Sequence, residues 1–582
     1  MPWLLVAILL TSFPLRAVPL HLDFFPEVDG QKLFIDSLRY AKDGNESFSL
    51  TRLDWLASDF AITTASGQTL TVPGSTALIS SRGGSYTLPD LRDAHLTSIS
   101  FFLGPDTETN HSDPAHYGSN HPLNPNRNKL HWDWQGGYIF LALEGHWRRS
   151  GQDVPSGFAY HFANDWNRTK ITLPIELKIR NESRVAIGFD VHRLLAGIHF
   201  AEDGHTTHSH KGDPVAFQLK QNLPTSFRIA GIHRGGLPRP PDPPPPFDLP
   251  ASPKAYPITL PTHIPLPSLP SDNPLLRSRV DLGERLFHDT LLSKNHNLSC
   301  ASCHQGTVMS DPRPLSPGTD GRVGRRHSMP LFNLAWKNSF FWDGRATSLR
   351  QQALIPIEDP LEMNESLEHV VRKLKASAGY PEAFAHAFGS GAITPNTISM
   401  ALETFLLTRL SLNSRFDQAM QGKTTLTAEE QRGFELFFTE SEPRLNRHGA
   451  DCFHCHGGAL FTDHSFHHNG LTSTDDHGLE ETTGRASDRY KFSTPSLRNI
   501  ALTAPYMHDG RFATLEEVVD HYNEPMEASA TLDPNLAKRP NGLGLSAADK
   551  IALIAFLKTL TDPAFLATSK ISSENPNSSP PR

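Results

Sequence analysis

Two short motifs of the form Cys-x-x-Cys-His constrain this chain more than any other feature. They are Cys300-Ala301-Ser302-Cys303-His304 and Cys452-Phe453-His454-Cys455-His456, and together they contain all four cysteines of the chain. This spacing is typical of covalent c-type haem attachment, in which two thiols become thioethers and the histidine ligates the iron. We therefore expect two haems, one held by Cys300, Cys303 and His304 and the other by Cys452, Cys455 and His456.

A redox dithiol, a disulfide pair and half of a zinc site share the same cysteine spacing. Two copies of the full motif, with no spare cysteine, favour haem over all three alternatives.

Length and charge narrow the class of protein. The 582 residues give room for several domains. The hydrophobic content is 38%, the net charge is -8 and the pI is near 6.4, so no basic field attracts nucleic acid or an anionic membrane surface.

The beginning of the chain, 1–17, reads as a signal peptide. Its apolar run, 3–10, is too short to span a bilayer, although no lysine or arginine precedes it. Haem attachment to Cys-x-x-Cys-His also points to an extracytoplasmic compartment. We expect export to the periplasm or cell surface, with no transmembrane span after the signal is removed.

The next segment, 18–235, is predicted to be an all-β, sandwich-like domain, because short alternating runs are broken by turn residues. The clearest strand carries Ile171, Leu173, Ile175, Leu177 and Ile179. Pro174 lies within it and has no amide donor, so this strand should lie at a sheet edge.

A proline-rich linker, 236–272, follows, and fifteen of the residues from 238 to 274 are proline. Beyond it the pattern is mostly α. One helical face carries Ile398, Leu402, Phe405, Leu406 and Leu410, and Ser546 should cap a helix with apolar Ile551, Ile554, Phe556, Leu557 and Leu560. The last residues, 567–582, read as a disordered tail.

The helical part repeats itself after each haem motif. Asn333-Leu334-Ala335 precedes Asp343-Gly344-Arg345 by the interval that separates Asn499-Ile500-Ala501 from Asp509-Gly510-Arg511. This pattern predicts a duplicated cytochrome c unit, with a first haem domain at 273–420 and a second at 421–566.

The differences between the two copies assign their roles. Thr514 and Glu517 form a capping box for a helix that carries Tyr522, where the first copy has Pro356. Tyrosine offers an oxygen ligand and proline offers none, so the first haem is expected to be open to peroxide. Trp342 corresponds to His508 and is a candidate bridge between the haems, or else a core tryptophan. Glu362 is a candidate acid–base group for O–O cleavage, or a solvated carboxylate.

These residues resemble the di-haem cytochrome c peroxidase and MauG superfamily over roughly 273–566. The resemblance rests on both haem motifs and on Phe341-Trp342-Asp343-Gly344-Arg345-Ala346, Pro360-Leu361-Glu362-Met363 and Thr503-Ala504-Pro505-Tyr506-Met507-His508-Asp509-Gly510. It implies that Trp342 is the inter-haem bridge, that Glu362 and Gln352 belong to the peroxide pocket, and that Tyr522 is the distal ligand of the second haem.

Bacterial cytochrome c peroxidases of this superfamily have methionine where Tyr522 stands, and take electrons from a small cytochrome. A tyrosine at position 522 instead resembles the MauG and MbnH type, which oxidises protein side chains at a distance. Met507 is a competing candidate for the distal ligand. The inter-haem calcium site of the family uses an asparagine where this chain has His327, which argues against calcium.

The β domain resembles the MbnP and CorA copper proteins through His131-Trp132-Asp133-Trp134-Gln135-Gly136-Gly137-Tyr138 and Leu143-Glu144-Gly145. In that family a tryptophan becomes kynurenine and helps to bind copper. Trp132 and Trp134 are the candidate targets, with two core aromatic residues as the alternative. Candidate copper ligands are His131, His161 and His95. The histidines of 205–210 are a further candidate metal site, with an exposed loop as the favoured alternative.

The sequence thus predicts an exported di-haem c-type peroxidase that uses hydrogen peroxide to oxidise tryptophan, in its own copper-binding domain or in a partner copper protein. One alternative is peroxide reduction with electrons from a small cytochrome or cupredoxin. The other is a copper-binding protein whose haems only transfer electrons.

Overall fold

A computed structural model describes residues 18–566, apart from 43–44, 89–90, 92–93, 133–135, 153, 235–248, 251, 390 and 442–447. The predicted signal peptide, the predicted tail and much of the predicted linker therefore lie outside the described residues. Among the helices that are described, none combines the length and apolarity needed to cross a bilayer.

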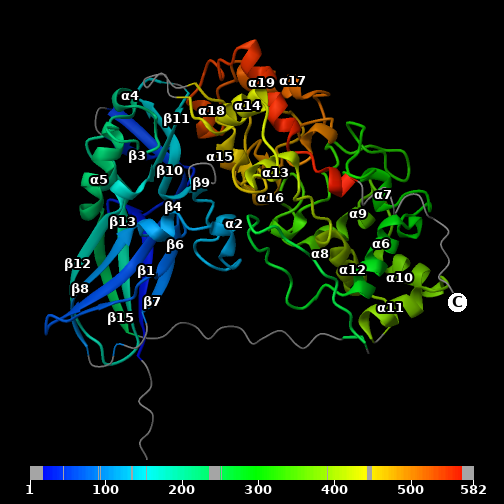
Figure 1. Cartoon of the computed structure of the whole chain (residues 1–582), viewed down its shortest axis with the longest axis horizontal. Coiled ribbons are helices and arrows are strands. Elements are labelled where there is room, and N and C mark those ends of the chain that lie inside the picture. The colour runs from blue at the N-terminus through cyan, green and yellow to red at the C-terminus, as the bar shows by residue number, and fades with distance from the viewer. Residues whose placement is uncertain are drawn as a thin grey trace, which may run out of the picture.

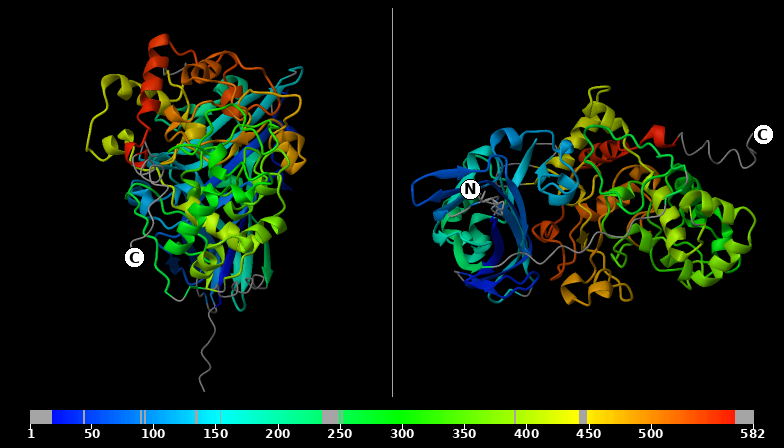
Figure 2. Two further views of the ribbon diagram at one scale, coloured as in Figure 1. Left: turned by 90° about the vertical axis from the view of Figure 1, so that its right-hand side faces the viewer. Right: turned by 90° about the horizontal axis from the view of Figure 1, so that it is seen from below.

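The N-terminal part is β-rich, as predicted, and contains two sheets packed face to face (Figures 1 and 2). The larger sheet has the order β12-β8-β4-β10-β11-β14, and the smaller has β15-β13-β1-β2 with β7 beside β1. The strands are β1 (Leu20–Val28), β2 (Gln31–Lys32), β3 (Tyr40–Lys42), β4 (Glu46–Thr64), β5 (Thr69–Thr71), β6 (Thr76–Ser80), β7 (Gly84–Leu88), β8 (His95–Leu103), β9 (His131–Trp132), β10 (Gly137–Arg149), β11 (Ser156–Ala163), β12 (Thr169–Lys178), β13 (Ser183–Asp190), β14 (Thr206–Thr207) and β15 (Phe227–Arg234).

This part also contains short helices. They are α1 (Thr107–Asn110), α2 (Pro125–Asn128), α3 (Val191–Leu194), α4 (Phe200–Asp203) and the longer α5 (Pro214–Ser226).

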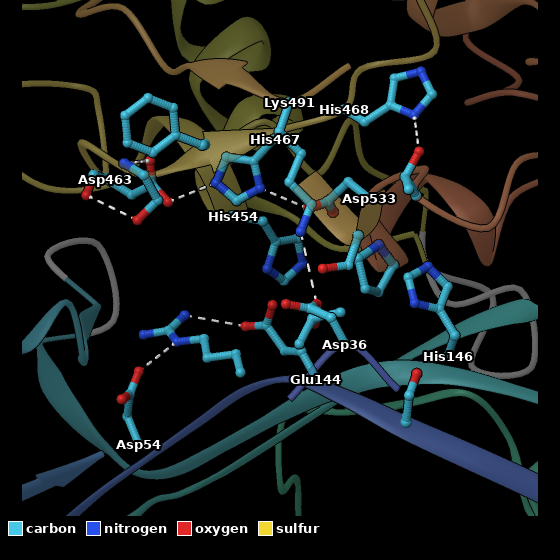
Figure 3. A pocket seen from close by; sticks show the side chains of 18 of the residues that line it. Asp36, Asp54, Glu144, His146, His454, Asp463, His467, His468, Lys491 and Asp533 are labelled. Atoms are coloured by element: carbon cyan, nitrogen blue, oxygen red, sulfur yellow. Dashed lines mark hydrogen bonds and ion pairs between the residues drawn. The ribbon is translucent and has the colours of Figure 1, made fainter. Parts of the chain in front are cut away.

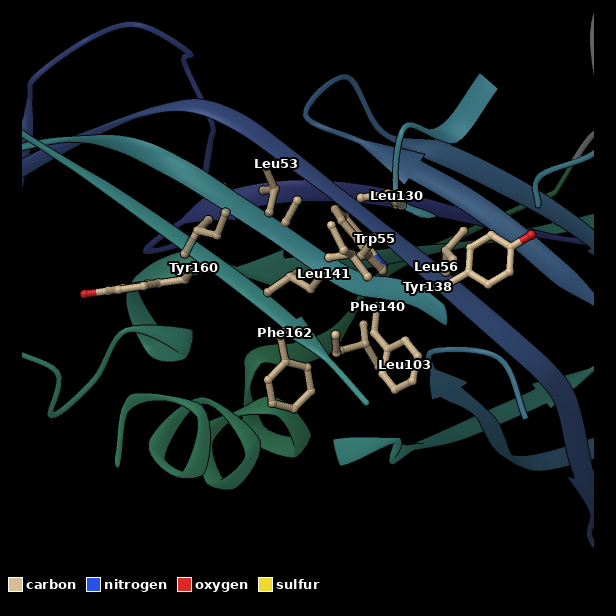
Figure 4. Close-up of a cluster of buried hydrophobic side chains, with 14 of the residues drawn as sticks. Leu53, Trp55, Leu56, Leu103, Leu130, Tyr138, Phe140, Leu141, Tyr160 and Phe162 are labelled. Carbon is tan, nitrogen blue, oxygen red and sulfur yellow. The ribbon is translucent and has the colours of Figure 1, made fainter. Parts of the chain in front are cut away.

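The core of the β domain lies between the sheets and continues around β4 and β10. Trp55 on β4 lies within this core (Figure 4). Its ring centroid is 4.7 Å from that of Phe189 on β13, and this contact joins the two sheets. Strand β12 alternates strictly between buried and exposed residues, so it covers the core on one face only. It is the last strand of its sheet and its register shifts after Pro174, which confirms the predicted edge position.

The C-terminal part is mostly helical. Its elements are α6 (Arg277–His288), α7 (Cys300–Cys303), α8 (Leu349–Gln352), α9 (Ile355–Glu358), α10 (Leu367–Ala376), α11 (Tyr380–Phe388), α12 (Pro395–Leu407), α13 (Arg415–Met420), α14 (Ala428–Phe438), α15 (Phe453–His456), α16 (Glu480–Thr483), α17 (Leu515–Asn523), α18 (Pro534–Ala537) and α19 (Ala547–Lys558), with the two-stranded β16 (Phe466–His467) and β17 (Phe492–Ser493).

The two halves of this part repeat one helix crossing. A Cβ atom on Gly283 of α6 would lie 2.0 Å from the Ala401 carbonyl oxygen of α12, and one on Gly433 of α14 would lie 1.9 Å from the Ala552 carbonyl oxygen of α19. Only glycine lets the backbones approach so closely. Both halves thus contain a helix crossing at a glycine, which agrees with the repeat that the sequence predicts.

The predicted helix starts are confirmed in detail. Thr514 and Glu517 form the expected capping box of α17, and Ser546 caps α19. Two predicted core positions differ: α12 ends at Leu407, so Leu410 lies beyond the helix, and Ile551 is 58% exposed because it lies on the outer face of α19.

The β domain rests against the second half of the helical part. His146 donates a hydrogen bond to the Leu532 carbonyl oxygen (2.7 Å), and Lys129 donates one to Ser465 Oγ (3.0 Å). Gly157 on β11 approaches α18 so closely that a Cβ atom would lie 2.0 Å from the Pro534 carbonyl oxygen. The two domains therefore pack closely where β11 meets α18.

We predict that Gly157→Val forces the two domains apart. Overpacking of this kind costs about 1–3 kcal/mol, and the change should lower the free energy of unfolding by that amount and increase the radius of gyration measured by small-angle scattering. Gly118→Val is the matched control, because no atom lies within 4 Å of the added Cβ. Equal behaviour of the two variants would contradict the close approach of β11 and α18.

Candidate functional site

The first Cys-x-x-Cys-His motif opens onto two adjoining cavities. Ser299 caps the single turn of α7 with a capping box that includes Ser302, which fixes the two cysteines on one face. A cavity of about 110 Å³ is lined by Cys300, Cys303 and His304, and one of about 170 Å³ shares His304 with it. Three predicted residues line both cavities: Gln352, Pro356 and Glu362.

The carboxyl group of Glu362 has an unusual environment. Burial, reinforced by the nearby charge of Asp359, raises the pKa of Glu362 to about 7, although Arg345 lowers it in part. A carboxyl group poised near neutrality can both take up and release a proton at that pH. The side chain is therefore suited to the acid–base role predicted for it.

The second motif opens onto a mostly apolar cavity of about 210 Å³, lined by Cys452, Cys455 and His456. Tyr522 and Met507 also line it. Asn469 Nδ2 lies 3.5 Å from both Tyr522 Oη and Met507 Sδ, so the two candidate ligands approach the cavity from neighbouring positions. Burial raises the pKa of Tyr522 to about 12.

The cysteine environments fit thioether attachment better than thiolate chemistry. Burial raises the pKa of Cys300 and of Cys452 to about 12, and that of Cys455 to about 11. A redox dithiol or a zinc site needs thiolates, which an electropositive environment stabilises. All four cysteines lie beside cavities rather than in disulfides, so both motifs fit c-type haems.

Trp342 forms a wall shared by the two halves. It lines the 170 Å³ cavity of the first motif and the 210 Å³ cavity of the second. Its indole N–H donates a hydrogen bond to the His327 carbonyl oxygen (2.8 Å), and its own carbonyl oxygen accepts one from Ser493 N–H (2.8 Å). The imidazole of His327 is buried here, 3.1 Å from the Pro314 carbonyl oxygen, and the absence of calcium stays a prediction.

On the β domain, Trp132 is 4% exposed and faces the second haem motif. It lines a cavity of about 70 Å³, here called the interdomain cavity, together with His161, Phe453 and His454. Its ring stacks on His208, with centroids 5.3 Å apart. Trp132 therefore lies at the interface between the domains. Trp134, the other candidate, falls outside the described residues.

The three predicted copper ligands do not form one candidate ligand group among the described residues, although His131 and His161 both line the interdomain cavity. His161 is buried on β11, but His95 pairs with Glu176 beside β12, and His131 packs against Tyr138 with ring centroids 4.6 Å apart. The histidines grouped with His161 are instead His208 and His454. The expectation that the 205–210 segment is an exposed loop is wrong for His208, which is 6% exposed because β14 pairs with β11.

Buried carboxylates hold two of these imidazoles. Glu144 Oε1 accepts a hydrogen bond from His161 Nε2 (3.0 Å), and Glu440 Oε2 lies 2.5 Å from His208 Nδ1. Burial lowers the pKa of His161 and of His208, although Glu144 and Glu440 raise them in part. Burial alone would raise the pKa of Glu144, but Arg52 and His161 hold it well below its ordinary value.

Next to these residues, a polar cavity of about 760 Å³ separates the two domains (Figure 3). His467 lies in it between Asp463 (2.8 Å) and Asp533 (2.6 Å). Burial alone would lower the pKa of His467, but Cys455, Asp463 and Asp533 raise it well above its ordinary value. The two carboxylates favour the protonated form of this imidazole beside the second haem motif.

Comparison with known proteins covers both parts of the chain. Residues 277–425 match the family model described as di-haem cytochrome c peroxidase, and 17–210 match the model for MbnP. The chain is 39% identical to the methylamine utilization protein MauG of Methylorubrum extorquens over 296 residues, which cover 50% of this chain and 80% of that protein.

A second relative and one solved structure show similar coverage. Identity to the cytochrome c551 peroxidase of Nitrosomonas europaea is 33% over 290 residues, or 48% of this chain and 79% of that protein. The crystal structure of a MauG-like protein associated with microbial copper homeostasis is 37% identical, with a TM-score of 0.49, over 55% of this chain and 99% of that chain.

We predict that Glu362→Gln slows the reaction with hydrogen peroxide by roughly 10²–10⁴-fold, the usual contribution of a positioned acid–base group. The carboxylate form takes the first proton from peroxide, so the wild-type rate should rise with pH through the pKa of about 7, and the variant should lose that rise. Stopped-flow kinetics across this pH range measures both effects. Glu358→Gln, an exposed carboxylate on α9, is the control, and a pH-independent wild-type rate would contradict the assignment.

We predict that Tyr522→Phe changes the second haem from six-coordinate to five-coordinate, because the phenol oxygen is removed while the ring still fills the cavity. Electron paramagnetic resonance of the oxidised protein should show one low-spin haem signal replaced by a high-spin signal. Met507→Leu is the matched variant and should leave the spectrum unchanged. The opposite pattern would assign the ligand to Met507.

Proposed function

We propose that this chain, which belongs to the di-haem cytochrome c peroxidase family, oxidises Trp132 of its own β domain. The helical part is a MauG-like di-haem peroxidase, and the β domain is an MbnP domain. The single observation that carries the choice of substrate is that Trp132 is buried in the interdomain cavity with Phe453 and His454 of the second haem motif.

Residues shared between neighbouring cavities support a route for oxidising equivalents. Trp342 lines the cavities of both haem motifs, and His454 lines both the second haem cavity and the interdomain cavity. Between His454 and Trp132 lies His208, whose ring centroid is 5.7 Å from His454 and 5.3 Å from Trp132. Closely spaced rings thus connect the second haem motif to the indole.

The bound haems supply the oxidising power that is drawn from hydrogen peroxide. In the first haem pocket, Glu362 moves the proton between the two peroxide oxygens, and Pro356 offers no donor atom that competes for that space. An electron that leaves Trp132 passes His454 between the interdomain cavity and the second haem cavity. It then passes Trp342 between the second and the first haem cavities. The reacting side chain therefore need not enter the peroxide pocket.

The overall change balances as follows. Two molecules of hydrogen peroxide take up four electrons and four protons from the indole side and become four molecules of water. At Trp132, two water molecules supply the two oxygen atoms, the indole C2–C3 bond breaks and formylkynurenine forms, so that two molecules of water are gained overall. Hydrolysis then releases formate and leaves kynurenine at position 132.

We also propose that the reaction takes place in the periplasm or at the cell surface. The apolar run at 3–10 supports export, and so does the extracytoplasmic attachment of c-type haem. Peroxide reduction with electrons from a small cytochrome is the second candidate function, because Met507 also lines the second haem cavity, and a thioether ligand raises the haem potential.

We predict that peroxide treatment of the haem-loaded protein converts Trp132 to kynurenine, and that Trp342→Phe reduces the yield to background. Tandem mass spectrometry of the peptide that contains Trp132 and Trp134 measures the conversion and locates it. Trp336→Phe is the matched control, because Trp336 is equally buried and donates its indole N–H to the Pro265 carbonyl oxygen, away from the haem cavities. An unmodified peptide in protein that still consumes peroxide would overturn the proposal.

A further inference from the structure

We propose that Lys337 and His464 form a carboxylate-binding site that holds a propionate of the first haem. Both side chains line the cavity of about 170 Å³ that also contains His304 of the first haem motif. His464 lines the interdomain cavity as well, together with Trp132. The site therefore lies between the first haem pocket and the β domain.

The imidazole of His464 has hydrogen-bonding capacity that the protein does not use. The residue is 9% exposed, and its Nδ1 and Nε2 are both buried without a hydrogen-bond partner among the residues that the structure describes. A neutral imidazole has one N–H donor and one acceptor nitrogen, and buried polar atoms without partners are rare. A carboxylate in the adjoining cavity would accept the hydrogen bond that this N–H can donate.

Lys337 adds a positive charge that lacks a direct counter-charge. Its ammonium group donates a hydrogen bond to Ser493 Oγ (3.0 Å), although an ammonium group has three donors. Within the described part of the chain it forms no ion pair, and the carboxylate that acts on it, Asp463, is already bound to His467 at 2.8 Å. Burial lowers the pKa of Lys337 to about 8, and Asp463 opposes this effect in part. An anion placed against the ammonium group would remove this cost of burial.

The charges around His464 are unbalanced in the same direction. Burial is the main reason that the pKa of this imidazole falls to about 3, and the positive charges of Lys337 and Lys129 lower it further. Asp463 opposes the two lysines. Two ammonium groups facing one carboxylate leave an excess of positive charge where the two cavities meet, and such a field attracts an anion.

The two arginines of the first haem cavity are paired, in contrast to the lysine. Arg326 contacts Asp476 (2.7 Å) and Asp343 (2.5 Å), and Arg345 contacts Asp343 (3.2 Å). Among the described lysine and arginine residues that line this cavity, Lys337 is therefore the one without a carboxylate partner.

The position of the cavity identifies the carboxylate. His304 lines both this cavity and the adjoining one that contains Cys300 and Cys303, so a haem attached to those cysteines reaches both. A haem carries its two propionates on the edge away from the vinyl groups that join the cysteines. Lys337 and His464 line the cavity without the cysteines, as residues that meet the propionate edge should. A free small carboxylate such as formate has the same chemistry and is the other possible source.

The site predicts an effect on the first haem. The negative charge of a propionate favours ferric over ferrous iron, and a cation held against it offsets that preference. Loss of the Lys337 charge should therefore lower the reduction potential of the first haem. This inference concerns haem binding and not oxidation of Trp132, so the two proposals can fail separately.

The test uses full-length protein with both haems attached. Lys337→Met keeps the length of the side chain and removes its charge, whereas Lys337→Arg keeps the charge. Resonance Raman spectroscopy measures the deformation band of the haem propionates, and a redox titration followed by electron paramagnetic resonance measures the first haem through its high-spin signal. We expect a shifted propionate band and a lower potential of the first haem in Lys337→Met, with values closer to wild type in Lys337→Arg. His464→Phe keeps a ring without nitrogen and should also shift the band.

The matched control is Lys129→Met. Lys129 also acts on His464 and donates to Ser465 Oγ (3.0 Å), but it lines the interdomain cavity and not the first haem cavity. This variant should keep the wild-type propionate band and the wild-type potential of the first haem. Excess formate should leave the wild type unchanged, and haem content confirms folding of every variant.

An unshifted band and potential in Lys337→Met would overturn the site, and His464→Phe decides in the same way if Lys337→Met does not retain haem. Equal shifts in Lys337→Met and Lys129→Met would also overturn it, because they would show an effect of charge at a distance. A saturable response of the wild-type spectrum to formate would overturn the choice of the propionate. A change confined to the potential of the second haem would overturn the assignment to the first. Mass spectrometry of the Trp132 peptide reports separately on the oxidation.

Discussion

The contact between the β domain and the short helix α15 is the interaction on which the rest of the structure depends. One turn of helix presents Cys452, Cys455 and His456 to the second haem cavity, while Phe453 and His454 face the β domain. A single helical turn directs neighbouring residues to opposite sides. The haem motif is therefore also a docking surface, and any shift of the β domain moves residues that adjoin the haem cavity.

Buried charge makes this docking specific. Glu440 of the helical part lies against His208 and accepts a hydrogen bond from Thr206 of the β domain, while Lys538 holds its other side. A carboxylate buried in this way is strongly disfavoured unless every partner is present. If the β domain were undocked, Lys538 would be the main partner left to Glu440. The buried charge of Glu440 therefore favours the one docked position in which His208 and Thr206 also contact it.

The sequence predicted features that depend on local rules or on direct repetition. The haem motifs, the capping box at Thr514 and the edge strand at Pro174 all follow from short-range chemistry, and each has the expected form. The repeat also identified Trp342, which lies between the two haem cavities. Such features can be predicted because each depends on residues that are close in sequence or on two copies that can be aligned.

The grouping of His161, His208 and His454 could not be predicted in the same way. His208 and His454 are separated by more than two hundred residues, and they meet only because β14 adds to the edge of β11 and the domain then docks on α15. His454 occupies a position of the haem motif that attachment leaves free, so a histidine there carries no local explanation. That freedom was the one available signal: a polar residue at an unconstrained position of a buried motif is best explained by a partner outside the motif.

The haem cavities and the interdomain cavity lie in the order that the proposed reaction requires. Glu362 lies with the first haem motif, Trp342 lines the cavities of both haem motifs, and Trp132 lies beyond the second. In the proposed reaction, peroxide and the indole of Trp132 are thus kept apart by protein, and only electrons need to pass between them. Trp132 is only 4% exposed and cannot reach the first haem pocket, so the proposed reaction relies on the second haem motif, against which the β domain packs. The fusion of the two domains makes that packing intramolecular, which replaces an encounter between two proteins by a fixed contact.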